Sequence, residues 1–430
     1  MTFDQYAAIA IFAGAYVLIA TERVHRVAAA MGGAGLMLAL RLIDGETAYR
    51  SEEAGIDWNV IFLLLGMMMI VGVIKQTGLF EYMAIAAAQR AKGRPYYLMV
   101  LLVVITALAS ALLDNVTTVL LIVPVTFLVC DRLDLPVVPF LIAEVLASNI
   151  GGTATLIGDP PNIIIASRAD LTFNDFILNL APAVVILMLA FLVVIRFMFR
   201  KSFIVSPDHV DSVMAMSPRA EIKDGVLLVK CMVVLALVLA GFIMQTTLHL
   251  EPSVVALLGA GVLLLITKVT TYEALAEVEW ETLAFFGGLF VMVGALVDTG
   301  VIEKVAEQLA DASGGKLLLA TVIVLLASFV LSGLVDNIPY VAAMSPIVAN
   351  LVADFGSDGR VLWWALALGS DLGGNATAVG ASANVVVLGI AAKRGAPISF
   401  WEFTKYGLVV TALSMLITLP YLWLRYFVLA

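Results

Sequence analysis

Residues 148–162 read SNIGGTATLIGDPPN and lie within a chain that is otherwise strongly apolar. A Gly-Gly pair, a third Gly and a Pro-Pro pair remove helix propensity and backbone hydrogen bonds within this short segment. We therefore expect the backbone to unwind here. At membrane depth, unwound backbone is tolerated only where protein buries it or where it lines a watery cavity. It then offers carbonyl groups to cations and helix N-termini to anions.

The same pattern occurs a second time, without proline, in SDLGGNATAVGASAN at residues 370–384. Residues 58–162 as a whole align without a gap with residues 280–384. The aligned segments SALLDNVTTVLLIVP (110–124) and SGLVDNIPYVAAMSP (332–346) place an Asp-Asn pair inside an apolar run in each copy. The chain therefore contains an internal repeat with two polar breaks per copy.

The composition is that of a polytopic membrane protein, because 62% of the 430 residues are hydrophobic, 13% are charged and the mean hydropathy is +1.06. The net charge of −9 argues against a nucleic-acid partner. The N-terminus lacks the basic start of a signal peptide, so we expect the first apolar run to be retained. Runs long enough to cross a bilayer are predicted at residues 4–20, 27–43, 58–76, 175–199, 225–246, 252–267, 281–298 and 404–427.

The distribution of Lys and Arg predicts the orientation, because basic loops remain in the cytoplasm. Basic segments such as 90–94 and 196–201 alternate along the chain with acidic segments such as 44–57. The alternation fits an all-α protein of about eleven transmembrane helices in the inner (plasma) membrane, with both termini outside. This count requires that the chain enters the membrane and returns to the same side within residues 95–130, and again within residues 317–353. Each of these regions forms either two full spans or a re-entrant hairpin.

The two copies of the repeat then begin in opposite directions across the membrane. Such inverted-topology repeats can exchange outward-open and inward-open states, with a binding site where the copies meet. The predicted segments are an N-terminal transmembrane helix (1–26), a first repeat (27–200), a cytoplasmic linker (201–224), a transmembrane helix that joins the halves (225–251) and a second repeat (252–430).

Asp114 and Asp336 are the most informative polar residues, because a carboxylate at the centre of a spanning helix costs about 2.5 to 3.5 kcal/mol. We interpret them as sites for a proton or cation, with Asn115 and Asn337 contacting the substrate. The alternative is that each Asp caps the N-terminus of a half-helix, and the two roles can coexist. Asp159 has no acidic counterpart in the second copy and is either a coupling-ion ligand or a turn residue before a proline.

The full set of candidate substrate- and ion-binding residues comes from the four polar breaks. Its Ser and Thr members can instead satisfy backbone groups or a neighbouring helix. Glu144, outside these breaks, is either functional or the partner of a basic residue. Cys130, Cys231 and the three histidines form no metal-ligand pattern, so neither a metal nor a cofactor is predicted. The candidates are Asp114, Asn115, Thr117, Thr118, Gly152, Thr153, Thr155, Asp159, Asn162, Asp336, Asn337, Asp371, Asn375, Thr377, Ser382 and Asn384, of which Asp114, Asp336 and Asp159 are the candidates for proton coupling.

Four segments carry a family resemblance: LDNVTTVLLIVPVT, IAEVLASNIGGTATLIGDPPNIIIAS, DNIP and LGGNATAVGASANVVVLGIA. Over residues 27–427 the chain resembles the ion transporter superfamily, specifically its arsenite permease-like branch, which includes the melanosomal P protein. The resemblance implies a re-entrant hairpin and a broken helix in each repeat, with unwound loops at 151–162 and 373–384. It also implies a transport domain that moves like an elevator against a scaffold, and it admits a homodimer.

The resemblance favours efflux of trivalent arsenite or antimonite by proton exchange, and it also admits sodium as the coupling ion and a cytoplasmic ATPase partner, as in some arsenite efflux systems. Arsenite is an uncharged trihydroxide near neutral pH, so carboxylate, amide and hydroxyl groups can bind it. The dicarboxylate carriers of the superfamily have Ser-Asn-Thr hairpin tips instead of Asp-Asn. A sodium/proton antiporter or a small-anion carrier on the same fold is the closest alternative, and a passive channel or an intramembrane aspartyl protease is more remote.

Overall fold

The computed structural model describes residues 1–21, 24–51, 53–203 and 214–429, and the regular elements of this part of the chain are helices. Several helices begin after a capping side chain, such as Thr2, Asp57 or Asp224. The first helices are α1 (Phe3–Ala20), α2 (Arg26–Ala39), α3 (Gly45–Arg50), α4 (Trp58–Lys75), α5 (Leu79–Ala91), α6 (Pro95–Leu112), α7 (Asn115–Leu133), α8 (Val137–Gly152), α9 (Pro160–Ala169), α10 (Phe173–Asn179), α11 (Ala181–Met198) and η1 (Arg200–Ser202). They are followed by η3 (Pro218–Glu221), α13 (Gly225–Ile243), α14 (Gln245–Leu248), α15 (Pro252–Ile266), α16 (Thr271–Ala276), α17 (Trp280–Asp298), α18 (Val301–Ser313), α19 (Leu317–Leu334), α20 (Asn337–Phe355), η4 (Gly356–Arg360), α21 (Val361–Gly373), α22 (Ser382–Lys393), α23 (Phe400–Trp423) and η5 (Leu424–Val428).

Nine helical segments of the described chain are long and apolar enough to cross a membrane, and five shorter apolar helices accompany them. Most of the predicted apolar runs coincide with one helix each. The run predicted at 175–199 is wrong as a single helix, because it is divided between α10 and α11 at Leu180. Pro182 lies in the first turn of α11, where its missing N–H disturbs no intrahelical bond, so it favours a new helix start.

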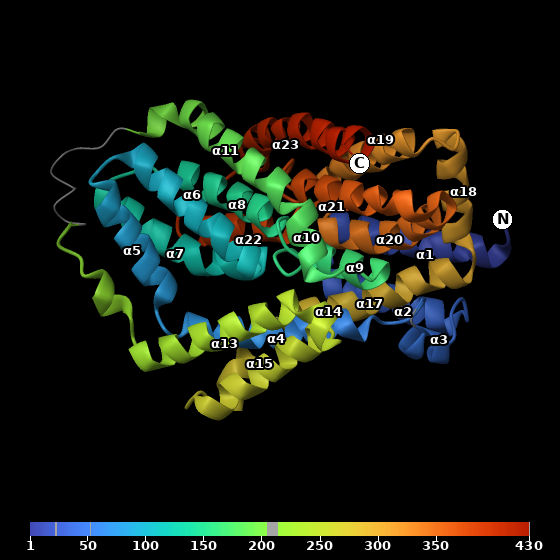
Figure 1. Cartoon of the computed structure of the whole chain (residues 1–430), viewed down its shortest axis with the longest axis horizontal. Helices are drawn as coiled ribbons and strands as arrows, with labels where there is room; N and C mark the ends of the chain where they lie inside the picture. Colours follow the sequence, from blue (N-terminus) through green and yellow to red (C-terminus); the bar gives the residue numbers. More distant parts are fainter. Residues whose placement is uncertain (22–23, 52, 204–213, 430) are drawn as a thin grey trace.

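The long helices run roughly along the longest axis of the molecule (Figure 1). α4, α13 and α15 lie along one side, and the helices from α5 to α11 and from α19 to α23 form most of the other side. α4 packs on α15, α2 on α17, α6 on α8 and α19 on α21. α8 and α21 are the most deeply placed, since every residue from Phe140 to Gly152 and from Val361 to Gly373 is buried. Their polar ends therefore lie in the protein interior.

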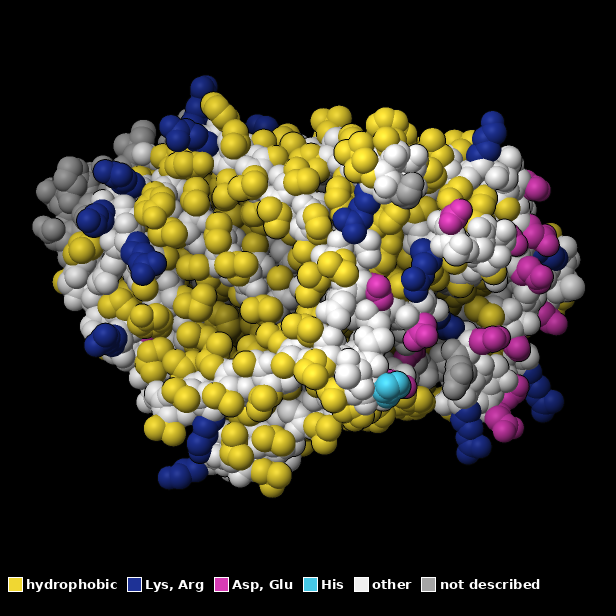
Figure 2. Space-filling view, viewed as in Figure 1, with side chains coloured by type: hydrophobic (Ala, Val, Ile, Leu, Met, Phe, Trp, Pro, Cys, Tyr) yellow, Lys and Arg dark blue, Asp and Glu magenta, His cyan; other side chains and the backbone are white. Residues whose placement is uncertain are grey.

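The surface is divided into an apolar middle and two polar ends. Figure 2 shows hydrophobic side chains over most of the face between the ends, with Lys and Arg gathered at the end that carries α5. Most of the Asp and Glu side chains in this view lie toward the opposite end. An apolar belt between polar ends fits the hydrocarbon core of a bilayer.

Candidate functional site

Four interruptions of helices meet in the interior. The helical hairpin of α6 and α7 turns at Asp114, and the hairpin of α19 and α20 turns at Asp336. α8 is separated from α9 by residues 153–159, and α21 is separated from α22 by residues 374–381. Both Gly-rich segments are therefore unwound, as their composition predicted.

A threonine holds each hairpin against the neighbouring unwound loop. Thr155 Oγ1 donates to the carbonyl oxygen of Ala111 at 2.5 Å, and Thr377 Oγ1 donates to the carbonyl oxygen of Gly333 at 2.7 Å. These hydroxyls satisfy backbone groups that the hairpin turns leave unpaired. The alternative considered for the Ser and Thr candidates, a bond to the backbone, therefore applies to both residues.

The carboxylate of Asp159 lies between the two hairpin tips. Asn115 Nδ2 donates to Asp159 Oδ2 at 3.0 Å, and Asn337 Nδ2 lies 3.3 Å from each of the two carboxylate oxygens. Asp159 and both asparagines are buried, and the Asp159 side chain makes no capping bond to α9. Asp159 stands directly before Pro160 at the start of α9, and its side chain is directed to the tips.

Asn149, on α8, connects the first hairpin tip with the second unwound segment and the start of α22. Its Nδ2 atom donates to Asn375 Oδ1 at 2.9 Å and to Asn384 Oδ1 at 3.0 Å, and its Oδ1 atom accepts from Asn115 Nδ2 at 3.3 Å. Asn384 Nδ2 in turn donates to the carbonyl oxygens of Gly374 and Thr377, at 2.9 Å each. The network is buried, so each bond replaces one that water would otherwise make.

We expect Asn149→Asp to lower stability and transport together. The substitution preserves the side-chain shape, but it removes the two N–H donors. It places a carboxylate against the side-chain amide oxygens of Asn375 and Asn384. An unpaired buried acceptor costs about 1 to 3 kcal/mol, and more when it is charged. Thermal unfolding in detergent should therefore begin several degrees lower than in the unaltered protein. Asn350→Asp, a change at an exposed position of α20, should leave the unfolding temperature within about one degree.

Several oxygen atoms near this centre have no hydrogen-bond donor among the residues that the structure describes. They belong to buried side chains and are Asn115 Oδ1, Thr118 Oγ1, Asn162 Oδ1 and Asp371 Oδ2. Asp371 is buried beside Asp159, whose carboxylate it affects electrostatically. Buried polar atoms without a partner require an explanation. A bound solute with hydrogen-bond donors, or a bound cation, would give these oxygen atoms a partner. Among the described residues, no group of three or more His, Cys, Asp or Glu is arranged to hold a metal ion.

Asp114 and Asp336 both cap the helices that follow them. Asp114 Oδ1 accepts from the backbone N–H of Thr117 at 2.7 Å, and Asp336 Oδ1 accepts from the backbone N–H of Ile338 at 3.0 Å. The capping interpretation is therefore confirmed for both residues. Asp336 Oδ2 remains available for a second contact and accepts from Ser382 Oγ at 2.5 Å.

A cavity of about 770 Å³, here called the vestibule, leads to Asp336 and Ser382. Its walls come from the N-terminal parts of α2, α17 and α22, the second hairpin tip and α7. Most of the wall is apolar. Its polar and charged side chains are His25, Arg26, Glu279, Glu281, Thr282, Asp336 and Ser382.

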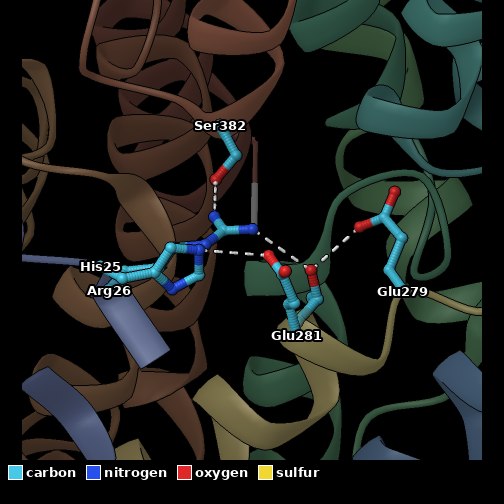
Figure 3. A network of polar contacts seen from close by, with 6 residues as sticks. His25, Arg26, Glu279, Glu281 and Ser382 are labelled. Carbon is cyan, nitrogen blue, oxygen red and sulfur yellow. Dashed lines mark hydrogen bonds and ion pairs between the residues drawn. The ribbon is translucent and has the colours of Figure 1, made fainter. Parts of the chain in front are cut away.

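Arg26 joins two acidic residues of the vestibule, Asp336 and Glu279, through hydroxyl groups. Figure 3 shows its guanidinium directed to Ser382, with Glu279 on the other side. Its Nη1 atom donates to Ser382 Oγ at 2.9 Å, and Ser382 in turn donates to Asp336. Its Nη2 atom donates to Thr282 Oγ1 at 3.3 Å, and Thr282 donates to Glu279 Oε2 at 2.9 Å. The guanidinium on α2 thus contacts both α17 and the start of α22.

The structure brings most of the predicted site residues into this region. Asn375 is buried in the second unwound segment, and Gly152, Asn162 and Asn384 are buried at the adjoining ends of α8, α9 and α22. Thr153 Oγ1 donates to the Asn149 carbonyl oxygen at 2.8 Å. Thr117 contributes its backbone N–H to the cap of α7. Glu144 lies outside the site, between α7 and α8, and accepts from Thr126 Oγ1 at 2.7 Å, so the alternative of a basic partner is not borne out among the described residues.

Sequence reasoning missed Asn149, Arg26, Thr282 and Glu279. Asn149 carried a signal, because it aligns with the candidate Asp371 in the repeat. Arg26 and Glu279 carried none, since each stands at the edge of an apolar run far from the polar breaks in sequence.

These features define the class of protein: a multi-pass, all-helical membrane protein with a buried polar centre that a cavity approaches. Residues 16–369 match the model of the CitMHS family, described as a citrate transporter. The chain belongs to this citrate transporter family.

Three relatives are similar over nearly the whole chain. A protein of Mycobacterium tuberculosis, described as an uncharacterized transporter, is 57% identical over 424 residues, which cover 98% of this chain and 99% of the relative. The 46 kDa membrane protein of Mycobacterium leprae is 53% identical over 425 residues, with the same coverage. The P protein of Homo sapiens is 34% identical over 495 aligned residues, which cover 96% of this chain and 59% of the P protein.

The expected similarity to the P protein is confirmed, and the matching family belongs to the ion transporter superfamily. The chain is a secondary transporter and not an enzyme, which excludes the intramembrane protease. The family description names citrate, so arsenite transport stays a proposal.

Proposed function

We propose that the chain is a secondary active transporter that exchanges a small, uncharged, hydroxyl-bearing solute for protons, with arsenite or antimonite as the leading candidate. The observation that carries this proposal is the acceptor-rich centre, where Asp159 faces both hairpin tips and where Asp371 and Asn162 each have an oxygen without a donor in the described part of the chain. Such a centre suits a solute whose own hydroxyl groups donate hydrogen bonds, or a proton. It disfavours a polyanion, because like charges repel in a buried site.

Alternating access between inverted repeats is the mechanism we propose. Each helix pair of the first copy has a counterpart in the second copy. The α2–α17 pair corresponds to the α15–α4 pair, the α6–α8 pair to the α19–α21 pair, and the α7–α22 pair to the α20–α9 pair. These pairs support two halves that can exchange conformations while the hairpins and broken helices move as one transport domain.

The proposed orientation places the Lys- and Arg-rich end in the cytoplasm and both termini outside. α7 and α22 line the vestibule near their N-terminal ends. Arg132 lies in the last turn of α7 and Arg394 directly follows α22, so both helices end at basic residues. On this proposal the vestibule opens inward, and the structure represents an inward-facing state.

Citrate is a second candidate, favoured by the description of the family. An anion of this kind would have Arg26 as its cationic contact in the vestibule and His25 as a second nitrogen-bearing contact. A sodium/proton antiporter would use the same acceptor-rich centre for its cation.

Uptake into everted membrane vesicles separates these candidates. With the vesicle interior acidified, we expect arsenite to accumulate and the accumulation to collapse when a protonophore is added. Replacing the pH gradient with a sodium gradient should not restore it. Citrate accumulation without arsenite accumulation would assign the chain to anion transport, and sodium-driven pH change without either solute would make it an antiporter.

A further inference from the structure

Glu279 is an acidic residue of the vestibule that the proposed transport centre does not use. It stands directly before α17, where its side chain makes no capping bond. The side chain is half-buried and lines the vestibule. Its Oε2 atom accepts a hydrogen bond from Thr282 Oγ1 at 2.9 Å, which Figure 3 shows. The carboxylate therefore has fewer donors than it would have in water, while the cavity gives protons access to it.

The charged groups that act on Glu279 come from α2, from the first hairpin tip and from α17 itself. Asp114 contributes a negative charge, Arg26 a positive charge and Glu281 a second negative charge. His25 is directed to Glu281, and its Nε2 atom lies 3.4 Å from Glu281 Oε2. Burial, followed by the charge of Asp114, raises the pKa of Glu279 to about 7, and Arg26 acts in the opposite direction.

We propose that Glu279 is a proton-binding site in the vestibule, separate from the buried Asp and Asn centre, and that Arg26 transmits its charge state to Asp336. A proton from vestibule water converts the carboxylate into a carboxylic acid, and no other covalent bond changes. Arg26 reaches Glu279 through the Thr282 hydroxyl and Asp336 through the Ser382 hydroxyl.

Neutralising Glu279 removes one of the two acidic groups between which the guanidinium lies. Arg26 then interacts more strongly with the remaining pair, Ser382 and Asp336. Proton binding in the vestibule thereby strengthens the contact between α2 and the second hairpin tip. Proton binding itself is independent of the transported solute, whereas its coupling to solute movement rests on the proposed proton exchange.

The direct test is infrared spectroscopy of the full-length protein in lipid bilayers, with spectra recorded as a function of pH. Protonated carboxyl groups absorb at a frequency distinct from that of carboxylates, so each titrating acid contributes a band. The unaltered protein should show a carboxyl group that titrates near pH 7. Glu279→Gln should remove this contribution, and the amide oxygen of Gln can still accept the bond from Thr282.

Glu281→Gln is the matched control, because it removes a carboxylate two residues away in the same cavity. The band should persist in this variant. Persistence of the whole titration in Glu279→Gln would overturn the proposal and assign the proton to another acid. Should Glu279→Gln fail to fold, Thr282→Val decides the question: loss of the hydrogen bond to the carboxylate should move the midpoint to higher pH, and an unchanged midpoint would overturn the proposal.

A transport measurement then tests the coupling. Arsenite uptake by the unaltered protein should vary with pH on the vestibule side with a midpoint near pH 7, and Glu279→Gln should flatten this dependence while Glu281→Gln retains it. Absence of arsenite uptake by the unaltered protein contradicts the proposed function alone, because the infrared titration of Glu279 does not require a transported solute.

Discussion

Replacing Asp159 with Asn is expected to lower solute transport by about 100-fold. The carboxylate accepts amide hydrogens from Asn115 and Asn337, and hydrogen bonds to a charged group contribute about 1.5 to 3 kcal/mol each. Asn is neutral, retains one acceptor oxygen and introduces two N–H donors, so both tips lose their charged partner and one of them faces a donor in place of an acceptor. A loss of about 2.7 kcal/mol corresponds to a factor of about 100 in an equilibrium constant.

The measurement is concentrative uptake into proteoliposomes, together with solute exchange at equal concentrations on both sides. Asp170→Asn is the control, because this exposed residue at the end of α9 has a left-handed backbone that Asn also tolerates. Exchange without concentrative uptake in Asp159→Asn would assign Asp159 to coupling alone. Uptake with the rate and pH dependence of the unaltered protein would show that Asp159 serves neither proton nor solute.

Replacing Gly158 with Ala is expected to prevent correct assembly of the first unwound segment. A Cβ atom at this position would lie 2.5 Å from the carbonyl oxygen of Gly152 and 2.7 Å from that of Ser110. Both contacts are with backbone, so the unwound loop or the hairpin must move to relieve them. Overpacking of this kind costs about 1 to 3 kcal/mol, and the displaced hairpin carries Asn115.

The expected result is a lower yield of monodisperse protein, a thermal midpoint lower by several degrees, and transport below detection. Gly389→Ala provides the comparison within α22, because a Cβ atom there meets nothing within 4 Å. A helical Gly→Ala change in open space should leave stability equal or slightly higher. Native stability in Gly158→Ala would mean that the loop has more freedom than its backbone contacts indicate.

The predictions made from sequence succeeded where a single local property decides the structure. Gly and Pro weaken a helix wherever it lies, so both unwound segments were found from composition. Asp before an apolar run is a capping signal, and Asp114 and Asp336 cap α7 and α20. The division of 175–199 into two helices was missed, although Pro182 marked a new helix start.

The partners of the site residues were beyond local reasoning. Thr155 and Thr377 were candidates for binding solute, but the structure directs them to backbone carbonyl oxygens of the adjacent hairpins. Asn149 became important only when the two halves came together, because its donors go to Asn375 and Asn384 in the second half. Such contacts depend on packing across more than 200 residues of chain, and no property of one segment encodes them.

The sequence by itself determined the class of the protein and the location of its polar breaks, because hydropathy, Gly and Pro act locally. Only the tertiary structure decided which oxygen atoms lack donors, how Asp159 relates to both tips, and that Arg26 joins Asp336 to Glu279. The physical reason is that hydrogen bonds form only at contact distance and charge interactions weaken with distance, so both depend on which groups the fold brings together. Their pattern is set by how α2, α17 and α22 come together, and the order of residues within each helix does not contain it.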